Sequence, residues 1–425
     1  MRQGHDTAPA LAAEDRERSA IEVSVNGRRY ALGRQPTVVI CADGCSLAYI
    51  DAAIAAGRAP SLMRMRSEGH DGTALAAMPT FTNPNNLSIV TGAPPSVHGV
   101  SGNYTLDRDT GAEVMMLDDA DMVGDTIPGA LSRAGARVAV ITAKDKLRKA
   151  LARGLDGLSG SAERAEELCR AIGPGFTAAA PDKYSADLSL FVLDAGLALL
   201  RQGRTDLMYL SLSDFVQHAY APDAPEAIDF VAALDQRLGA FLNGGAVVGL
   251  VADHGMSDMS LPDGTPNVVW IGDVLAARFG VHKTRVICPI TDPFGRHHAS
   301  LGGLVRIYLF DPGIDQESVR SALQEQAGVE LVLTGAEAAH RFSLPPEAEG
   351  DLVVIAAPGV ALGARQSDHD LSQLAGTRLR SHGGLAEQTV PFLLSHPLGG
   401  PVAARLATGA RVWDIFDAAL NGVAP

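Results

Sequence analysis

The chain has 425 residues, of which 46% are hydrophobic and 20% are charged, and its formal net charge is −14. This composition is typical of a globular protein with a large core, and the length allows two or three domains. The negative charge disfavours nucleic acid and anionic membranes as partners, and we expect neither. A small anionic substrate stays compatible with it, because bound divalent cations and lysines can make one pocket positive.

The N-terminal segment does not resemble a secretory signal. Residues 1–20 are polar and acidic, without a basic start followed by an apolar stretch, and no apolar run approaches the roughly 20 residues of a membrane helix. We therefore expect a cytoplasmic protein. The four cysteines form no CxxC pair and are expected to be reduced thiols: Cys41, Cys45, Cys169 and Cys288.

Apolar runs alternate with helical patterns from about residue 36 onward, after a tail that contains at most a strand pair, Ile21–Val25 and Arg29–Leu32. In chain order the patterns predict a strand at Thr37–Ala42, helices near Ser46–Ala56 and after Pro60, helices at Pro84–Thr91 and Asp125–Ala134, a strand at Arg137–Thr142, a helix at Leu188–Arg201, a strand at Leu207–Ser213, a helix at Ala224–Leu242 and a strand at Ala246–Ala252. Continuous apolar strands alternating with helices indicate an α/β fold whose largely parallel sheet is covered on both faces.

The pattern changes after Asp258. The segment that follows predicts a strand at Val305–Phe310, a helix at Glu317–Gln326 and strands at Glu330–Leu333 and Leu352–Ala356, before a last strand at Val390–Ser395 and a helix at Val412–Leu420. We therefore predict a tail at 1–35, an α/β core formed by 36–260 and 377–425, and a smaller α+β cap at 261–376.

Side chains that bind metals gather at the ends of the predicted strands. They are Asp43, the pair Asp253 and His254, the pair Asp214 and His218 in a D-x-x-x-H spacing, the later His382, and Thr82. Parallel strands place such groups at one edge of a sheet, and residues i and i+4 share a helix face. Carboxylate and imidazole together suit Zn²⁺, Mn²⁺ or Fe²⁺ better than Mg²⁺ or Ca²⁺. This set predicts a two-metal hydrolytic site.

Thr82 is the candidate nucleophile. A metal ion favours the alkoxide of a threonine, and the N-terminus of the helix predicted at Pro84–Thr91 attracts a phosphoryl group. In the alternative interpretation, Thr82 or Asn83 simply caps that helix. Thr80 is a rival hydroxyl that lies further from the helix start.

These motifs resemble the alkaline phosphatase superfamily over about residues 36–260 and 380–396. The resemblance implies that one metal is held by Asp43, Thr82, Asp253 and His254, and the other by Asp214, His218 and His382. It also implies that both metals are usually zinc. No C/S-x-P-x-R segment of sulfatases is present, whereas the threonine in Phe81-Thr-Asn83 is shared with the nucleotide pyrophosphatase/phosphodiesterase branch.

Within that branch the chain further resembles the phosphonoacetate hydrolases, through the Lys-x-Lys pair of Lys144 and Lys146. The pair follows a predicted strand at the edge expected to hold the metals, although such a segment is ordinarily a solvated helix start. The resemblance implies that both lysines bind substrate and that Asn103 contacts a phosphonyl oxygen. On the predicted cap, Arg296, His297 and His298 are adjacent, and of these Arg296 and His298 are candidate substrate ligands. Adjacent residues of this kind are more often partly exposed loop residues, which is the alternative interpretation.

The resemblance predicts hydrolysis of the carbon–phosphorus bond of phosphonoacetate to acetate and phosphate. Thr82 would attack phosphorus and form a phospho-threonine, and the leaving carbon would be stabilised as an enediolate-like species beside Lys144 and Lys146. The alternatives are a phosphodiesterase or nucleotide pyrophosphatase, a phosphatase of small phosphoesters, and a metal-binding module without turnover. A small phosphonate is the expected partner, and a homodimer is compatible with the sequence.

Overall fold

A computed structural model of the chain describes residues 21–116, 122–292, 298–374 and 376–423. Its centre is an eight-stranded sheet. The strands lie in the spatial order β20 (Ala410–Arg411), β4 (His70–Leu75), β19 (Thr389–Leu394), β10 (Val247–Val251), β3 (Thr37–Cys41), β9 (Leu207–Ser211), β7 (Val138–Thr142) and β8 (Leu158–Ser161). All neighbours are parallel except where β19 pairs with β10 and β4. The predicted α/β fold with a largely parallel sheet is confirmed.

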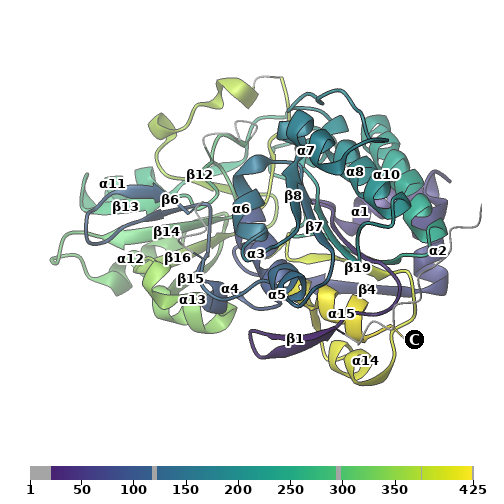
Figure 1. Cartoon of the computed structure of the whole chain (residues 1–425). Coiled ribbons are helices and arrows are strands. Elements are labelled where there is room, and N and C mark those ends of the chain that lie inside the picture. The colour runs from purple at the N-terminus through teal and green to yellow at the C-terminus, as the bar shows by residue number, and fades with distance from the viewer. Residues whose placement is uncertain (1–20, 117–121, 293–297, 375, 424–425) are drawn as a thin grey trace, which may run out of the picture.

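Helices cover both faces of this sheet (Figure 1). One layer consists of α1 (Leu47–Ala55), α2 (Pro60–Glu68), α7 (Ala165–Ile172), α8 (Asp187–Arg201) and α10 (Pro225–Asn243). The other consists of α3 (Thr82–Thr91), α5 (Ile127–Arg133), α6 (Arg148–Leu151) and α15 (Ile415–Asn421). Strands β3, β7, β9 and β10 are buried over their whole length, which is why their sequences are continuous apolar runs.

Two strands of the central sheet that the sequence patterns missed are less apolar than its buried strands. β4 has the sequence His-Asp-Gly-Thr-Ala-Leu and only one buried residue, and β8 has the sequence Leu-Ser-Gly-Ser. β4 enters the sheet by pairing with β19, far along the chain, and β8 by pairing with β7, the strand that precedes it. Backbone hydrogen bonds to a partner that lies elsewhere in the chain leave no local signal in a sequence.

A second sheet of four antiparallel strands lies beside the first (Figure 1). It is formed in the order β13 (Thr284–Ile287), β14 (Leu304–Leu309), β16 (Leu352–Ala356) and β15 (Val329–Thr334), with α11 (Ile271–Phe279), α12 (Gln316–Gln324) and α13 (Gly335–Phe342) packed against it. All these elements fall inside 261–376, and the division of the chain into core and cap at those residues stays a prediction.

The remaining elements are short. They are the pairs β1 (Glu22–Val25) with β2 (Arg28–Ala31), β5 (Tyr104–Leu106) with β6 (Glu113–Met115), β11 (Ser257–Asp258) with β18 (Arg380–Ser381) and β12 (Val268–Trp270) with β17 (Ala361–Gly363), and the helices α4 (Pro95–His98), α9 (Phe215–Ala219) and α14 (Gly400–Leu406). The predicted N-terminal strand pair is present as β1 and β2. Within the described ranges, no helix combines the length and the apolar character needed to cross a bilayer.

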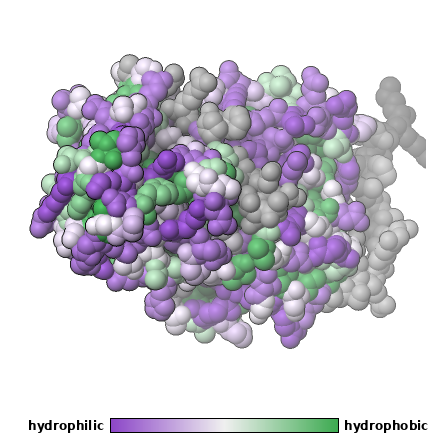
Figure 2. Space-filling view, turned by 90° about the vertical axis from the view of Figure 1, so that its left-hand side faces the viewer, coloured by the Kyte–Doolittle hydropathy of each residue, from purple (hydrophilic) through white to green (hydrophobic). Residues whose placement is uncertain are grey.

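Figure 2 looks onto the side of the molecule that carries the second sheet. Hydrophilic residues cover most of this face, and the hydrophobic residues lie in small groups between them. Such scattered apolar groups are ordinary on protein surfaces and identify no docking face.

A buried arginine of the second sheet forms an ion pair with Glu349 and a hydrogen bond to the segment before Asn103. Arg306 on β14 donates from Nε and Nη2 to Glu349 at 2.8 and 2.6 Å, and from Nη2 to Ser101 O at 2.9 Å. Both charged side chains are at most 2% exposed. Ser101 lies two residues before Asn103, so Arg306 holds the segment that carries a predicted substrate ligand.

Replacement of Arg306 by methionine should lower the free energy of unfolding by about 3–5 kcal/mol, because it leaves the Glu349 carboxylate buried without its partner. Urea unfolding followed by circular dichroism measures this loss. The double variant Arg306→Met/Glu349→Leu should recover part of it, since an apolar pair has no uncompensated charge. A loss below about 1 kcal/mol for the single variant would show that the pair behaves like a solvated one.

Candidate active site

Three neighbouring strands of the central sheet bring carboxylates to one edge. β10, β3 and β9 are parallel and adjacent. Asp253 lies two residues after the end of β10, Asp43 two residues after β3, and Asp214 three residues after β9. The carboxyl ends of parallel strands meet at the same edge of a sheet. The three side chains are buried there, each at most 3% exposed.

His254 lies at the centre of the first group. Its Nε2 is 3.3 Å from Asp43 Oδ1 and 3.8 Å from Asp253 Oδ2. The ligand atoms of these three residues all lie within 4.8 Å of one another, which is close enough for a single metal ion.

The second group is formed by Asp214, His218 and His382. The chain turns into α9 directly after Asp214, so His218 at i+4 places Nε2 3.0 Å from Asp214 Oδ2. His382, which follows β18, stacks on His254 with ring centroids 3.6 Å apart. Ligand atoms of Asp214, His254 and His382 also lie within 4.8 Å of one another, so the two groups are contiguous.

All three histidines present the same ring nitrogen to the cluster. Nδ1 of His218, His254 and His382 lies 2.7, 2.8 and 2.7 Å from the carbonyl oxygens of Arg380, Gly255 and Thr80. A carbonyl only accepts, so each Nδ1 carries the hydrogen and donates it. Each Nε2 is then the ring nitrogen that is left to face the cluster. Metal-ligating histidines are oriented in this way.

The electrostatics of the cluster fit bound cations. Burial raises the pKa of Asp253 well above its usual range, and the Asp43 carboxylate raises it further. Burial alone would lower the pKa of His254, but Asp253 and Asp43 raise it to about 9. Asp43 Oδ1 is buried and receives no hydrogen bond from the described residues. A cation between converging carboxylate oxygens and ring nitrogens offsets the negative charge of the carboxylates, and this donor set suits Zn²⁺, Mn²⁺ or Fe²⁺.

Thr82 lies beside the first group. α3 begins at Thr82 itself rather than at Pro84, its N-cap position is Phe81, and no side chain caps it. The capping interpretation of Thr82 and Asn83 is therefore wrong. The Thr82 hydroxyl is 3.2 Å from His254 Nε2. The rival Thr80 is instead engaged by the loop after His382, since its Oγ1 donates to Gly384 O at 2.9 Å.

The two lysines of the Lys-x-Lys segment point into this edge and are not a solvated helix start. Lys144 follows β7, and its Nζ donates to Asp214 Oδ1 at 2.8 Å. Lys146 Nζ forms an ion pair with the carboxylate of Asp292. Burial would lower the pKa of Lys144, but Asp214 and Asp43 raise it above its ordinary value. Burial and then the Lys144 ammonium lower the pKa of Lys146 to about 7.

Of the remaining predicted ligands, one lies beside the same cluster, one is buried in contact with Ile290, and one falls outside the described residues. Asn103 is buried, and its Nδ2 donates one of its two hydrogens to Ile290 O at 3.2 Å. His298 is buried with its ring 5.6 Å from that of His218, and burial followed by the neighbouring His218 lowers the pKa of His298 to about 3. Arg296 lies outside the described residues.

Two residues at the site were missed by the sequence patterns. Asp292 pairs with Lys146 from a segment that carries no motif. Asn86 donates to Asp253 Oδ2 at 2.9 Å. It lies four residues after Thr82, and this spacing on a predicted helix was the one available signal, since i and i+4 share a face.

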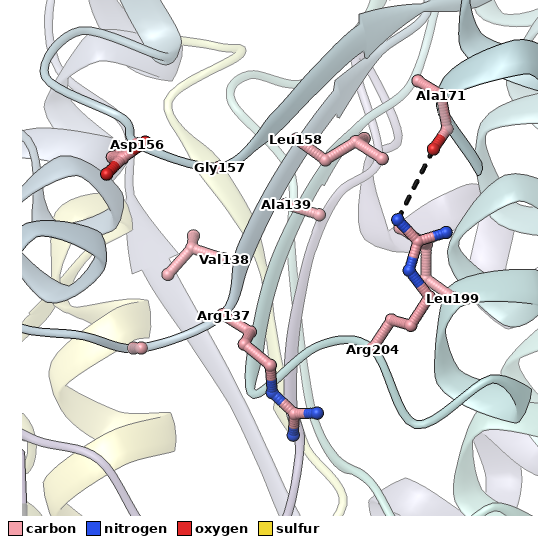
Figure 3. Close-up of a pocket in the computed structure, with 10 residues that line it drawn as sticks. Arg137, Val138, Ala139, Asp156, Gly157, Leu158, Ala171, Leu199 and Arg204 are labelled. Atoms are coloured by element: carbon pink, nitrogen blue, oxygen red, sulfur yellow. Dashed lines mark hydrogen bonds between the residues drawn. The ribbon is translucent and has the colours of Figure 1, made fainter. Parts of the chain in front are cut away.

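A cavity of about 450 Å³ lies at the opposite end of the sheet, at the start of β7 and β8 (Figure 3). Its two arginines are occupied: Arg204 donates to the carbonyl oxygens of Ile172 and Ala171, and Arg137 is paired with Asp206. Both arginines already bind groups of the protein, so this cavity offers them to no ligand. The candidate site therefore remains at the carboxyl edge of the central sheet.

The chain is similar to known hydrolases over most of its length. A family model described as type I phosphodiesterase / nucleotide pyrophosphatase matches residues 37–384. Two crystal structures of the phosphonoacetate hydrolase from Sinorhizobium meliloti 1021, in complex with phosphonoformate and with phosphonoacetate, match with TM-scores of 0.89 and 0.88. Each is 43% identical to this chain, and each alignment covers 96% of this chain and 100% of theirs.

A shorter match agrees with these. A phosphonoacetate hydrolase from Penicillium oxalicum is 60% identical over 37 residues, which are 8% of this chain. The matched segment spans 51% of that protein, so this chain spans about half the length of that relative.

Proposed function

The chain belongs to the type I phosphodiesterase / nucleotide pyrophosphatase family, and we propose that its reaction is the hydrolysis of phosphonoacetate to acetate and phosphate. The family and the fold confirm the resemblance to the alkaline phosphatase superfamily. The observation that carries the proposal is the position of Lys144 and Lys146 beside the carboxylate–histidine cluster and Thr82. A substrate with a phosphonate at one end and a carboxylate at the other needs cations beyond those that bind its phosphorus group.

The residues that would hold two divalent cations, in our proposal two Zn²⁺ ions, form the two groups described above. Asp43, Asp253, His254 and Thr82 form one site, and Asp214, His218 and His382 form the other. Bound cations lower the pKa of a hydroxyl or a water molecule and offset the charge of a phosphonate.

The chain's own residues account for the covalent steps. Thr82 Oγ1 loses its proton to solvent and attacks phosphorus in line with the carbon–phosphorus bond, and the phosphoryl group passes to Oγ1 as that bond breaks. The electron pair of the bond moves to the methylene carbon and into the carboxylate. The ammonium groups of Lys144 and Lys146 stabilise this enediolate-like anion, and Asn103 Nδ2 donates to a phosphonyl oxygen. Protonation at carbon gives acetate, and water cleaves the Oγ1–phosphorus bond to release phosphate.

The second candidate function is hydrolysis of a phosphodiester, which the family description favours. The same nucleophile and metal ligands serve both reactions. A nucleotide substrate needs an apolar or aromatic slot for its base, and aromatic residues are 5% of the chain. Purified protein incubated with phosphonoacetate and with an aryl phosphodiester, and assayed for phosphate and for the released phenol, separates the two functions. Release of phenol without phosphate from phosphonoacetate would favour the diesterase.

Replacement of Lys146 or Lys144 by alanine should lower kcat/KM for phosphonoacetate by roughly 10²-fold, the cost of removing one donor to a developing anion. Hydrolysis of an aryl phosphodiester should fall much less, because that substrate has no carboxylate. Lys149→Ala is the matched control, since Lys149 lies in the same segment but is exposed. Equal losses on both substrates would contradict the role of the lysines in carboxylate binding.

A further inference from the structure

Asn86 is a fully buried amide within hydrogen-bond reach of the candidate active site. It lies on α3, one helical turn after Thr82, and its side chain has no exposed surface (0%). It makes four side-chain hydrogen bonds. Nδ2 donates to Asp253 Oδ2 at 2.9 Å and to Thr82 O at 3.1 Å, and Oδ1 accepts from Tyr209 Oη and Ser211 Oγ, both at 2.8 Å.

The chemistry of the partners fixes the orientation of this amide. A backbone carbonyl and a carboxylate accept hydrogen bonds, so the side of Asn86 that faces Thr82 O and Asp253 must be the NH₂ group. The opposite side is then the carbonyl oxygen, and the hydroxyls of Tyr209 and Ser211 must donate to it. Both amide hydrogens and both lone pairs of Oδ1 are used. A buried polar group satisfied in this way has one favourable position.

The amide also completes the hydrogen bonding of Asp253. Asp253 Oδ1 accepts from the backbone nitrogens of Gly44 and His254, at 3.2 and 3.1 Å. Oδ2 accepts from Asn86, so the plane of the carboxylate is set from two sides. Because Asn86 also holds the carbonyl of Thr82, the same amide connects a predicted metal ligand to the turn that carries the predicted nucleophile.

We propose that Asn86 is a positioning residue, which orients the Asp253 carboxylate for the metal ion of the first group and holds the Thr82 turn of α3 against it. This inference rests on the proposed function, because it takes that group to bind a cation. Tyr209 and Ser211 hold the amide from β9, the strand that leads to Asp214. The nucleophile helix, β10 and β9 are thereby tied together by one side chain.

The decisive experiment is titration of the metal-free protein with Zn²⁺ in competition with a chromogenic chelator. Asn86→Leu, which keeps the size of the side chain and removes its hydrogen bonds, should weaken the binding of one of the two ions by about 10–100-fold. The effect should persist in an Asp214→Asn background, where the other site is impaired. It should largely disappear in an Asp43→Asn background, where the same site is already impaired.

Thr91→Val is the matched control, because it removes a buried hydroxyl from the same helix that bonds only to backbone carbonyls of α3. It should lower Tm in the metal-free state without changing either Zn²⁺ affinity. A purely structural Asn86 would behave in the same way, whereas a positioning residue also reduces the rise in Tm that Zn²⁺ produces.

Wild-type Zn²⁺ affinities and a wild-type rise in Tm in Asn86→Leu would overturn the inference. If that variant does not fold, the double variant Tyr209→Phe/Ser211→Ala removes the donors to Oδ1 instead. It should weaken the same ion several-fold, and unchanged affinity would equally overturn the inference. Wild-type protein that binds no Zn²⁺ and releases no phosphate from phosphonoacetate would instead reject the proposed function itself.

Discussion

Replacement of Thr82 by alanine should lower the rate of phosphate release from phosphonoacetate by on the order of 10⁴-fold or more, because it removes the attacking oxygen. The hydroxyl lies 3.2 Å from His254 Nε2 and makes no capping interaction with α3, so its loss should leave the helix intact. The measurement is the steady-state rate at saturating substrate, together with metal content. Metal should be retained, since six carboxylate and imidazole side chains remain.

Thr82→Ser is the conservative counterpart, and it should keep a substantial fraction of the activity because it preserves the hydroxyl. Rapid acid quenching followed by mass spectrometry of peptides should detect phosphate on residue 82 in the wild-type protein and in Thr82→Ser. Turnover by Thr82→Ala at the wild-type rate would rule out Thr82 as the nucleophile.

Removal of metal should have the second large effect. Dialysis against a chelator should lower activity by about 10³-fold or more, which corresponds to the several kcal/mol that divalent cations contribute to transition-state charge stabilisation. Elemental analysis should give two metal ions per chain before chelation and none afterwards, and added Zn²⁺ should restore activity. The metal-free protein should also have a lower Tm, because three carboxylates then converge without their cations.

Two histidine variants test whether the metal that supports activity is bound by the predicted ligands. His382→Ala should lose metal and activity together, because its Nε2 faces the cluster. His340→Ala is the control, since His340 is exposed on α13. Full activity in protein that contains no metal would contradict the two-metal proposal.

The conformations of the strands explain why much of the site could be predicted from the sequence. β3, β9 and β10 are buried on both faces, so each is a continuous apolar run whose end is visible as the first acidic residue. Because parallel strands share one edge for their carboxyl ends, Asp43, Asp214 and Asp253 could be expected to meet there without any knowledge of the strand order.

Other features needed the tertiary structure. The strand order, the position of β4 beside β19 and the helix start at Thr82 had no distinctive local pattern. The backbone carbonyl groups that accept from the histidine rings also cannot be identified from the sequence, since every residue has one. The pairing of Lys146 with Asp292 joins residues that are 146 positions apart. The roles of the ligands, the number and identity of the metals and the cap boundaries stay predictions.

The sequence by itself determined the alternation of strands and helices and the chemical types of the residues at the strand ends, because periodicity and residue type are local properties. The tertiary structure decided which hydroxyl faces the cluster, which ring nitrogen each histidine presents and how Asn86 holds Asp253. Those outcomes depend on hydrogen bonds between segments far apart in the chain, such as the 167 positions between Asn86 and Asp253. Such bonds form only when packing of the whole core has brought the segments together.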